Sequence, residues 1–317
     1  MQKKIVYISL FISFICVIVS GCIENSPSNG GHILHVNKEN YTSISDAIKA
    51  ANDNDTILVS KGTYHEMIII EKSIKLIAEE PNNTIITYIE GHHDHPDFIQ
   101  INAKGCTIEG FTILGDYPLT NASGISIFTS NNTVTHNNLF NADYGICVYS
   151  HSENNILSYN TFINSNAGIF VYASHNYICN NTLINNTFGI YLNDCSFNNI
   201  FLNNVSGNNW GIRLRGATSN QLYTNQIQNN VKGVYSCCGA MQNTIFKNNF
   251  INNSQNAYDD FTSSWYKNTI GNYWSDYRNL YPNAQSHDNI WDTLYSIPGG
   301  DNQDKYPLVK PFSASFS

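Results

Sequence analysis

The hydrophobic positions between residues 124 and 256 follow a repeating pattern. Six copies each begin with a glycine followed by Ile or Val, and successive glycines are spaced by 21, 23, 21, 22 and 22 residues. The first and third residues after the glycine are hydrophobic except for Ser236, and this alternation indicates a strand with one buried face. These pairs are Ile125/Ile127, Ile146/Val148, Ile169/Val171, Ile190/Leu192, Ile212/Leu214 and Val234/Ser236.

Two more positions recur in each copy, two and seven residues after an asparagine. They hold Val134, Leu157, Ile178, Phe201, Leu222 and Ile245, and then Leu139, Phe162, Leu183, Ser206, Ile227 and Phe250. Each copy therefore provides about three short strands and leaves no room for a helix. A repeat of this length indicates a solenoid. We predict an all-β parallel β-helix in which each strand pairs with its equivalent in the next coil, ~4.8 Å away.

Three asparagine positions separate the strands. They are Asn132, Asn155, Asn176, Asn199, Asn220 and Asn243; then Asn137, Asn160, Asn181, Asn204, Asn225 and Asn248; then Asn141, Asn164, Asn185, Asn208, Asn229 and Asn252. Asparagine tolerates the left-handed backbone of sharp corners. Its amide can also donate to one neighbouring coil and accept from the other. We predict asparagine ladders at the corners, because a disordered asparagine-rich tract would not keep this phase.

The flanking segments are expected to complete one domain. Residues 41–51 combine a Ser43/Asp46 helix start with a hydrophobic stripe, which predicts a short capping helix before a first strand at 56–59. We place the β-helix at 33–256, with six regular coils at 124–256 and a total length of ~50 Å for roughly ten coils. A C-terminal cap at 257–317 contains Trp265, Tyr266, Tyr273, Trp274, Tyr277, Tyr281, Trp291 and Tyr295.

Residues 1–22 have the features of an export signal. Lys3 and Lys4 precede a hydrophobic run over 5–19 that is short for a membrane span. The segment ends in Val-Ser-Gly-Cys22, which resembles the lipobox of prokaryotic lipoproteins. The resemblance implies cleavage before Cys22, a lipid on its thiol, and anchoring on the extracytoplasmic face of the membrane. Residues 23–32 would form a flexible tether. An ordinary signal peptide and an uncleaved anchor are the alternatives.

Motifs near both ends resemble a known family. Residues 41–77 carry the patterns A-I-x-A-A, D-T-I-x-V and G-T-Y-x-E, and the C-terminal part carries GNYWSDY at 271–277, IPGG at 297–300 and YPL at 306–308. With the six coils, they resemble the secreted pectin-lyase-like proteins, especially the NosD-type periplasmic copper-binding family. The resemblance implies a right-handed, all-parallel helix. It does not by itself imply copper binding, because the family name comes from a nitrous-oxide-reductase accessory role.

The outward positions of the glycine-led strands form the candidate binding face. They lie two and four residues after each glycine and make an aromatic stripe that runs into two arginines. Aromatic rings and guanidinium groups suit sugars that carry carboxylates, although aromatic residues also favour solvent-facing strand positions. The predicted ligand-binding residues are Tyr149, Phe170, Tyr172, Tyr191, Asp194, Arg213, Arg215 and Tyr235.

Charge and acidic residues limit the function classes. The net charge of −8 argues against nucleic acid or an anionic membrane surface as a partner. A glycosidase needs two carboxylates across a cleft, but the only acids between 124 and 255 are the widely separated Asp143, Glu153 and Asp194. A lyase or epimerase would need a base and a charge-neutralising group. Arg213, Arg215 and Asp194 could supply these, but no catalytic motif is present.

Metal sites have three weak candidates. One is the loop with His92, His93, Asp94, His95 and Asp97, and another is a corner column of His151, His175 and Cys195. Copper is the ion considered for these donors. Calcium is considered for Asp288, Asp292, Asp301 and Asp304, although that segment lacks the glycines of calcium loops. Most cysteines are expected to be free thiols, since Cys195 and Cys238 lie two coils apart.

Together these features favour a monomeric, exported lipoprotein that binds a polysaccharide or another cell-envelope glycan without catalysis. A lyase or epimerase acting on an acidic glycan stays open as one alternative. A copper-binding accessory protein of the NosD type is the other. No cofactor is predicted firmly, and nucleic acid is not expected as a partner.

Overall fold

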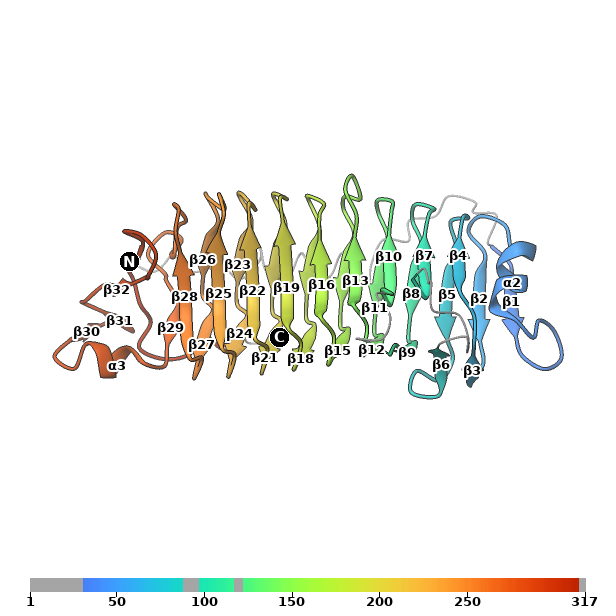
Figure 1. The fold of residues 1–317 in the computed structure, drawn as a ribbon, viewed down its shortest axis with the longest axis horizontal. Coiled ribbons are helices and arrows are strands. Elements are labelled where there is room, and N and C mark those ends of the chain that lie inside the picture. Colours follow the sequence, from blue (N-terminus) through green and yellow to red (C-terminus); the bar gives the residue numbers. More distant parts are fainter. Residues whose placement is uncertain (1–30, 88–96, 117–121, 314–317) are drawn as a thin grey trace, which may run out of the picture. The chain divides into compact units, whose positions relative to one another are not determined.

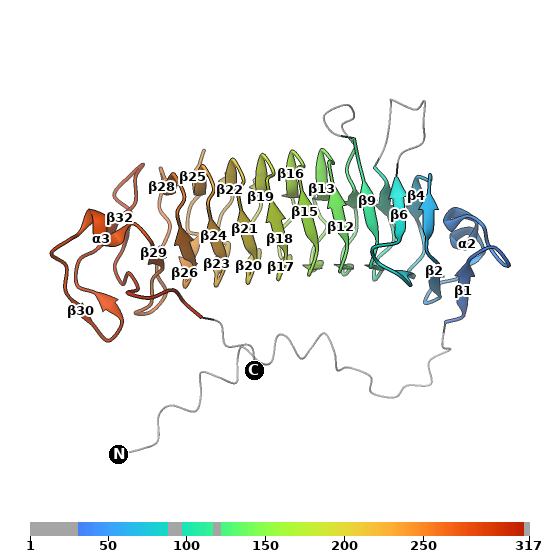
Figure 2. The ribbon, with the colours of Figure 1, turned by 90° about the horizontal axis from the view of Figure 1, so that it is seen from below.

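The computed structural model describes residues 31–87, 97–116 and 122–313. These residues wind into a parallel β-helix whose coils stack along one long axis (Figures 1 and 2). Three sheets run along the solenoid, and every strand in them pairs in parallel with its equivalent in a neighbouring coil. The predicted fold class is therefore confirmed.

The three sheets differ in their place in the coil. Sheet A comprises β1 Ile33–Val36, β2 Thr56–Val59, β5 Lys75–Ala78, β8 Thr107–Glu109, β11 Thr133–Thr135, β14 Ile156–Ser158, β17 Tyr177–Cys179, β20 Asn199–Phe201, β23 Gln221–Tyr223 and β26 Thr244–Phe246. Sheet B comprises β3 Gly62–Tyr64, β6 Thr84–Thr87, β9 Thr112–Leu114, β12 Asn138–Phe140, β15 Thr161–Ile163, β18 Thr182–Ile184, β21 Asn204–Ser206, β24 Gln226–Gln228, β27 Asn249–Ile251 and β29 Tyr273–Trp274. Sheet C, which contains the glycine-led strands, comprises β4 Ile68–Ile70, β7 Ile99–Ile101, β10 Ile125–Ile127, β13 Tyr144–Val148, β16 Ala167–Val171, β19 Phe188–Asn193, β22 Trp210–Arg215, β25 Lys232–Cys237 and β28 Gln255–Asp259.

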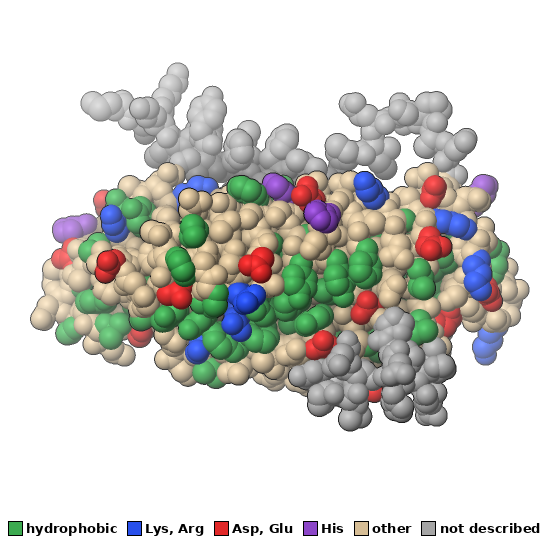
Figure 3. All heavy atoms as spheres, turned by 45° about the horizontal axis from the view of Figure 1, so that its top comes forward, with side chains coloured by type: hydrophobic (Ala, Val, Ile, Leu, Met, Phe, Trp, Pro, Cys, Tyr) green, Lys and Arg blue, Asp and Glu red, His purple; other side chains and the backbone are tan. Residues whose placement is uncertain are grey.

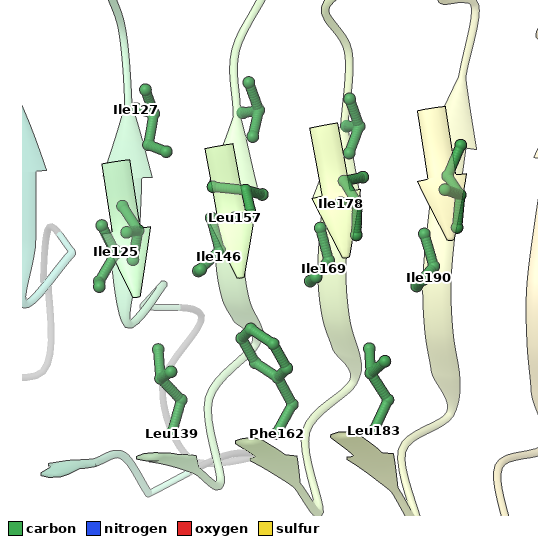
Figure 4. Packing of buried hydrophobic residues seen from close by; sticks show 14 of the residues in the cluster. Ile125, Ile127, Leu139, Ile146, Leu157, Phe162, Ile169, Ile178, Leu183 and Ile190 are labelled. Carbon is green, nitrogen blue, oxygen red and sulfur yellow. The ribbon is translucent and has the colours of Figure 1, made fainter. Parts of the chain in front are cut away.

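The hydrophobic pattern fills the interior with columns of equivalent side chains. In sheet C the register aligns Ile125, Ile146, Ile169 and Ile190, all fully buried. Figure 4 shows these isoleucines in line along the core, with Leu139, Phe162 and Leu183 forming a second row. Burying an aliphatic or aromatic side chain stabilises the fold by roughly 1.5–3 kcal/mol. The repeat therefore forms a continuous core of stacked like residues.

The corners contain the predicted asparagine ladders. In the corner before sheet B, the backbone N–H of Asn160 donates to Asn181 Oδ1 over 2.9 Å, and that of Asn181 donates to Asn203 Oδ1 over 3.0 Å. The side-chain amide of Asn181 also donates to Asn203 Oδ1 and to Leu157 O. A second ladder runs through Asn132, Asn155, Asn176, Asn198, Asn220 and Asn243.

The predicted phase is wrong by one residue in the fourth coil. The ladder members there are Asn198 and Asn203, where Asn199 and Asn204 were predicted. The core positions are correspondingly Ile200 and Val205, both fully buried, and the predicted Phe201 and Ser206 lie one residue further on. Two adjacent asparagines at each corner of this coil made both phases compatible with the sequence.

The left-handed backbone belongs to the residue before each ladder member. Asn141, Asn164, Asn185, Asn229 and Asn252 have φ between 52° and 58° and are left-handed corner residues. The third ladder lies one residue later, at Ser165, Asn186, Asn230 and Asn253, except in the fourth coil, where the predicted Asn208 is the ladder member and Gly207 precedes it with a left-handed backbone. The prediction that one asparagine does both tasks is therefore wrong. Phe197 and Leu202 also take the left-handed position, so tertiary structure imposes it on residues that do not favour it.

The N-terminal end is covered by the predicted helix. Helix α2 spans Ile44–Ala50, and Ser43 caps it by accepting a hydrogen bond from the backbone of Asp46. Its hydrophobic stripe is buried, as expected. The predicted first strand, β2, is preceded by β1, which pairs with it. No helix in the three described ranges is long and apolar enough to span a membrane.

Aromatic stacking closes the C-terminal end. Sheets C and B continue past residue 256 into β28 and β29. Trp274 stacks on Phe250 with ring centroids 4.3 Å apart, and Tyr295 stacks on Trp274 at 4.0 Å. The short helix α3 Tyr277–Leu280 and two small antiparallel hairpins follow, at the orange-red end of Figure 1. The hairpins are β30 Ser286–His287 with β31 Ile290–Trp291, and β32 Tyr295–Ser296 with β33 Gln303–Asp304.

Candidate functional site

The outer side of sheet C carries three columns of side chains, here called the sheet C face. The strand register places equivalent residues of successive coils next to one another. One column holds Tyr144, Ala167, Phe188, Trp210 and Lys232, the next holds Cys147, Phe170, Tyr191, Arg213, Tyr235 and Tyr258, and the third holds Tyr149, Tyr172, Asn193, Arg215 and Cys237.

The N-terminal part of the sheet C face is a packed aromatic layer. Phe170 is only 6% exposed and lies 4.5 Å, between ring centroids, from both Tyr172 and Tyr191. Phe170 therefore packs beneath its neighbours and supports them. The sequence analysis expected it to contact a ligand, but its side chain is too buried for that. Tyr149 and Tyr172 are stacked at 6.4 Å and are partly exposed. Because stacking covers ring faces, these tyrosines offer ring edges and hydroxyl groups to a ligand.

Beyond the aromatic layer, the strands β22 and β25 carry cationic side chains on the same face. The guanidinium of Arg213 lies 5.0 Å from the Tyr191 ring centroid and 4.9 Å from that of Trp210. The ammonium of Lys232 lies 3.8 Å from the Trp210 ring. Figure 3 shows a band of hydrophobic side chains on one face, with Lys and Arg side chains clustered beside it. Such cation–π contacts hold the charged groups in place, each by roughly 0.5–2 kcal/mol.

The charge of Arg213 is not neutralised by the described residues. Neither Arg213 nor Lys232 forms an ion pair with a described carboxylate, and the Nε atom of Arg213 is buried without a hydrogen-bond partner there. Arg215 differs, since its Nη1 donates to Asn193 Oδ1 over 3.0 Å and lies 3.7 Å from Asp194 Oδ2. Arg213 and Lys232 are thus available to an external anion.

Apart from the buried Phe170, the predicted site residues fall into two groups. Tyr149, Tyr172, Tyr191, Arg213 and Tyr235 lie together on the face and are partly exposed. Asp194 and Arg215 form an exposed pair at its edge, where such pairs contribute little to stability.

Sequence reasoning missed a whole column of this face. Tyr144, Phe188, Trp210 and Lys232 each stand immediately before a glycine, and the strands begin with them. Strict period-two alternation would have pointed them inward, like the Ile or Val that follows each glycine. The strands depart from alternation at the glycine, since a Cβ atom on Gly145 would meet the core residue Phe162 while Tyr144 packs on Phe170 of the outer side. Tyr258 on β28, stacked 4.4 Å from Tyr235, was missed because the repeat was taken to end at residue 256.

Three tyrosines of the face, Tyr144, Tyr149 and Tyr191, stay protonated at neutral pH. Burial raises the pKa of Tyr144 to about 12, and burial likewise raises the pKa of Tyr149 and Tyr191. Arg213 opposes this shift at Tyr191 without reversing it. None of these three phenols is therefore prepared to act as a general base, which would need a pKa near the working pH.

The three acids considered in the sequence analysis, Asp143, Glu153 and Asp194, do not come together on this face. Asp143 accepts a hydrogen bond from Asn166, and burial raises the pKa of its carboxyl. Glu153 lies 3.7 Å from the imidazole of His175, and Asp194 is engaged by Arg215. These three carboxylates thus lie apart from one another, whereas Asp97 lies near enough to Asp143 to raise the pKa of that carboxyl further.

The metal candidates receive no support from the described residues. His92, His93, Asp94 and His95 lie outside them. His151 and His175 are exposed corner residues, whereas Cys195 is buried, and the three do not form a group that could hold a metal ion. In the cap, Asp304 is buried and Asp288 is exposed. Within the three described ranges, no group of three or more His, Cys, Asp or Glu residues could hold a metal ion.

The comparisons with known proteins agree with this architecture. A family model described as "Periplasmic copper-binding protein (NosD)" matches residues 82–279. No curated protein matched the chain. The enzymatically active domain of bacteriophage CBA120 tailspike protein 2 superposes with a TM-score of 0.61 at 11% identity, over 86% of this chain and 52% of the tailspike chain. A structure of XylC in complex with xylose gives 0.54 at 11% identity, over 76% and 67%.

The chain belongs to the NosD family, since the family model covers more than half of it. The resemblance inferred from the terminal motifs and repeats is thereby confirmed. The chain spans about half the length of the tailspike domain, and at such low identity the solved structures show the fold alone. Copper, which the family description names, does not fit the described residues as a site of three or more donors.

Proposed function

We propose that this protein binds an anionic polysaccharide of the cell envelope along the sheet C face and does not cleave it. The observation that carries the proposal is the placement of Arg213. Its guanidinium rests on the rings of Phe188, Tyr191 and Trp210 and has no carboxylate partner among the described residues. A guanidinium held in this way can donate two parallel N–H hydrogen bonds to the carboxylate of a uronic acid.

The remaining side chains suit an extended chain of sugars. Neutral tyrosine hydroxyls donate to and accept from sugar hydroxyls, and partly exposed ring edges contact their apolar sides. Equivalent residues recur at the strand spacing of ~4.8 Å, which is close to the length of one sugar unit in an extended polymer. One similar structure contains xylose, and this adds support for a sugar ligand without identifying it.

Binding is favoured over catalysis by the state of the ionisable groups. A lyase or epimerase would need a base beside the cation, and Tyr191 is the group in that position. The raised pKa of Tyr191 keeps it protonated. Incubation with alginate or polygalacturonate should therefore yield no unsaturated product and no change of sugar composition. Appearance of either would favour the enzyme alternative.

The binding test removes single charges from the face. Arg213→Gln should weaken the affinity for polygalacturonate or alginate oligosaccharides by about tenfold or more, since a hydrogen bond to a charged group contributes about 1.5–3 kcal/mol. Isothermal titration at low salt measures this loss. Tyr172→Ala should weaken binding less, because its partly exposed ring supplies one edge contact.

The matched control is Lys267→Gln. Lys267 lies beside Gln221 and Phe246 of sheet A, so the variant loses one positive charge on another face. It should bind as the wild-type protein does. Equal affinity in Arg213→Gln and Lys267→Gln would refute the sheet C face as the site.

The proposal includes export and lipid attachment at Cys22, which lies outside the described residues. The lipobox-like segment supports it. Expressed in a prokaryotic host, the wild-type protein should fractionate with membranes and Cys22→Ser should not. Membrane retention of the variant with an intact N-terminus would instead show that residues 5–19 are the anchor.

A further inference from the structure

Cys237 and Cys238 bring two thiols together at the edge of the sheet C face. Cys237 ends β25, and the two Sγ atoms of these consecutive residues are 3.0 Å apart. A tight turn holds the pair, because the backbone N–H of Ala240 donates to Cys237 O over 3.2 Å. Cys238 has a φ of 60° and is followed by Gly239 at 89°. Such left-handed backbone at a non-glycine residue is held by the surrounding structure.

The two thiols have different environments. Cys238 is exposed, whereas Cys237 is only 5% exposed. Burial and, to a smaller extent, the neighbouring Cys238 raise the pKa of the Cys237 thiol to about 11, although Arg213 acts in the opposite direction. An external reagent therefore meets Cys238 first. Cys237 is placed to react second, from within the protein.

We propose that Cys237 and Cys238 form a reversible thiol–disulfide site that is oxidised by small disulfides. The Cys238 thiolate attacks one sulfur of the disulfide RSSR, and RS⁻ leaves and takes up a proton. The Cys237 thiol then loses its proton and attacks Cys238 Sγ, which expels the second RS⁻. One Cys237–Cys238 bond forms, two electrons pass to the reagent, and two RSH molecules are released. This proposal does not rest on the proposed glycan binding, although Cys237 belongs to the sheet C face and interacts with Arg213.

Chain geometry makes the bond reducible. Cα atoms of consecutive residues are ~3.8 Å apart across a trans peptide, whereas disulfides usually join Cα atoms that are roughly 4.4–6.8 Å apart. A bond in such a short ring is strained, and strained disulfides have more oxidising potentials than structural ones. The pair therefore suits a reversible modification better than a permanent cross-link.

Peptide mapping tests the proposal on the full chain. Cleavage after Lys232 and Lys247 releases residues 233–247, whose only cysteines are Cys237 and Cys238. The reduced native protein is treated with oxidised glutathione, free thiols are blocked, and the peptide is weighed. The wild-type peptide should have lost two hydrogen atoms and carry neither glutathione nor the blocking group. Dithiothreitol should restore both thiols.

Three variants separate the steps. Cys237→Ser should stop at one glutathione on Cys238, and Cys238→Ser should leave the peptide unmodified. Cys147→Ser, which removes another buried thiol of the same sheet, should oxidise as the wild-type protein does. A wild-type peptide that stays reduced, retains glutathione, or is cross-linked to a different cysteine would overturn the proposal. Retained glutathione would show that Cys237 cannot reach Cys238 in the folded chain.

Discussion

At the scale of single residues, the ladder asparagines combine burial with complete hydrogen bonding. Asn181 Oδ1 accepts from the backbone N–H and the side-chain amide of Asn160, while its own amide donates to Leu157 O and Asn203 Oδ1. A buried polar group without partners would cost about 1–3 kcal/mol. The ladder avoids this cost in every coil that it crosses, and its side chains carry no charge that would repel the next copy.

Replacement of one ladder asparagine should therefore be costly. Asn181→Leu removes these side-chain bonds and leaves the backbone N–H of Asn160 without its acceptor in the interior. We expect the free energy of unfolding to fall by about 1–3 kcal/mol. Urea denaturation followed by circular dichroism measures the change. The control is Asn209→Ala, an exposed asparagine beside ladder member Asn208. Similar small losses in both variants would contradict the ladder's contribution.

The residue scale also shows where prediction from sequence reaches its limit. The repeat identified the first two ladders in five of six coils, because asparagine recurs there with fixed spacing, but it placed most of the third ladder one residue early. In the fourth coil, the Asn198–Asn199 and Asn203–Asn204 pairs offer two equivalent phases. Packing decided between them, since Ile200 and Val205 fit the fully buried core positions. Such a choice depends on contacts with neighbouring coils and not on local preference.

At the scale of elements, the glycine-led strands need glycine for close approach. A Cβ atom on Gly189 would lie 2.5 Å from the carbonyl oxygen of Gly211 in the next coil and 2.9 Å from Val205 Cγ1. The sequence analysis used these glycines only to set the phase. The structure shows why no larger residue replaces them in the regular coils.

The cap ends one ladder with a carboxylate. The backbone N–H of Asn248 donates to Asn272 Oδ1, and that of Asn272 donates to Asp304 Oδ2 over 2.7 Å. Trp274 Nε1 donates to the same oxygen over 2.9 Å. Asp304 therefore joins the last ladder residue to the aromatic residues that cover the core. The sequence analysis considered Asp304 as a calcium ligand. In the structure its carboxylate instead accepts hydrogen bonds that fix the cap to the last coil.

Asp304 should make cap stability depend on pH. Burial raises the pKa of its carboxyl to about 6, well above the unfolded value of about 3.9. The contribution of the protonated Asp304 carboxyl to the free energy of unfolding is therefore complete below about pH 3.9. It is lost as the pH rises through about 6. Relative to Asp304→Asn, the wild-type protein should lose on the order of 3 kcal/mol between pH 4 and 7.

Denaturation across this pH range, monitored by tryptophan fluorescence, checks the effect. Asp301→Asn, which changes an exposed carboxylate of the same cap, should retain the wild-type pH profile. Parallel profiles for wild type and Asp304→Asn would show that the buried carboxyl does not titrate in this range.

At the scale of the whole molecule, a protein of net charge −8 presents two cations on the sheet C face, Arg213 and Lys232, that have no carboxylate partner among the described residues. The sequence indicated this face, because period-two alternation assigns Arg213 and Tyr191 outward. It did not reveal that Phe170 is covered by its neighbours, because alternation predicts which side of the sheet a side chain lies on but not how much of it is exposed. It also missed the supporting rings of Phe188 and Trp210, which fix the guanidinium in place. The fold was therefore more predictable than the site.

The extent of the face should appear in its dependence on ligand length. From β13 to β28 the sheet C face crosses five strand intervals, or ~24 Å. If a polymer lies along the solenoid axis, each added uronic acid meets another coil, and weak contacts add up within one bound chain. Affinity for uronate oligosaccharides should rise up to roughly five or six sugars and then level off. It should fall as salt increases, because the Debye length shortens to ~8 Å at physiological ionic strength.

Neutral glucan oligosaccharides of the same lengths provide the control, and a titration series at two salt concentrations gives the measurement. The neutral glucans should bind more weakly than the uronates, and their affinity should depend little on salt, because they lack the carboxylates that Arg213 and Lys232 attract. Arg213→Gln should lower the affinity for every uronate long enough to reach β22 and should reduce the salt dependence. Affinity that is already maximal for a disaccharide would instead indicate a short subsite near Arg213. In that case the aromatic layer would serve to hold the guanidinium and not to bind the polymer, because the rings beyond Tyr191 would add nothing to binding.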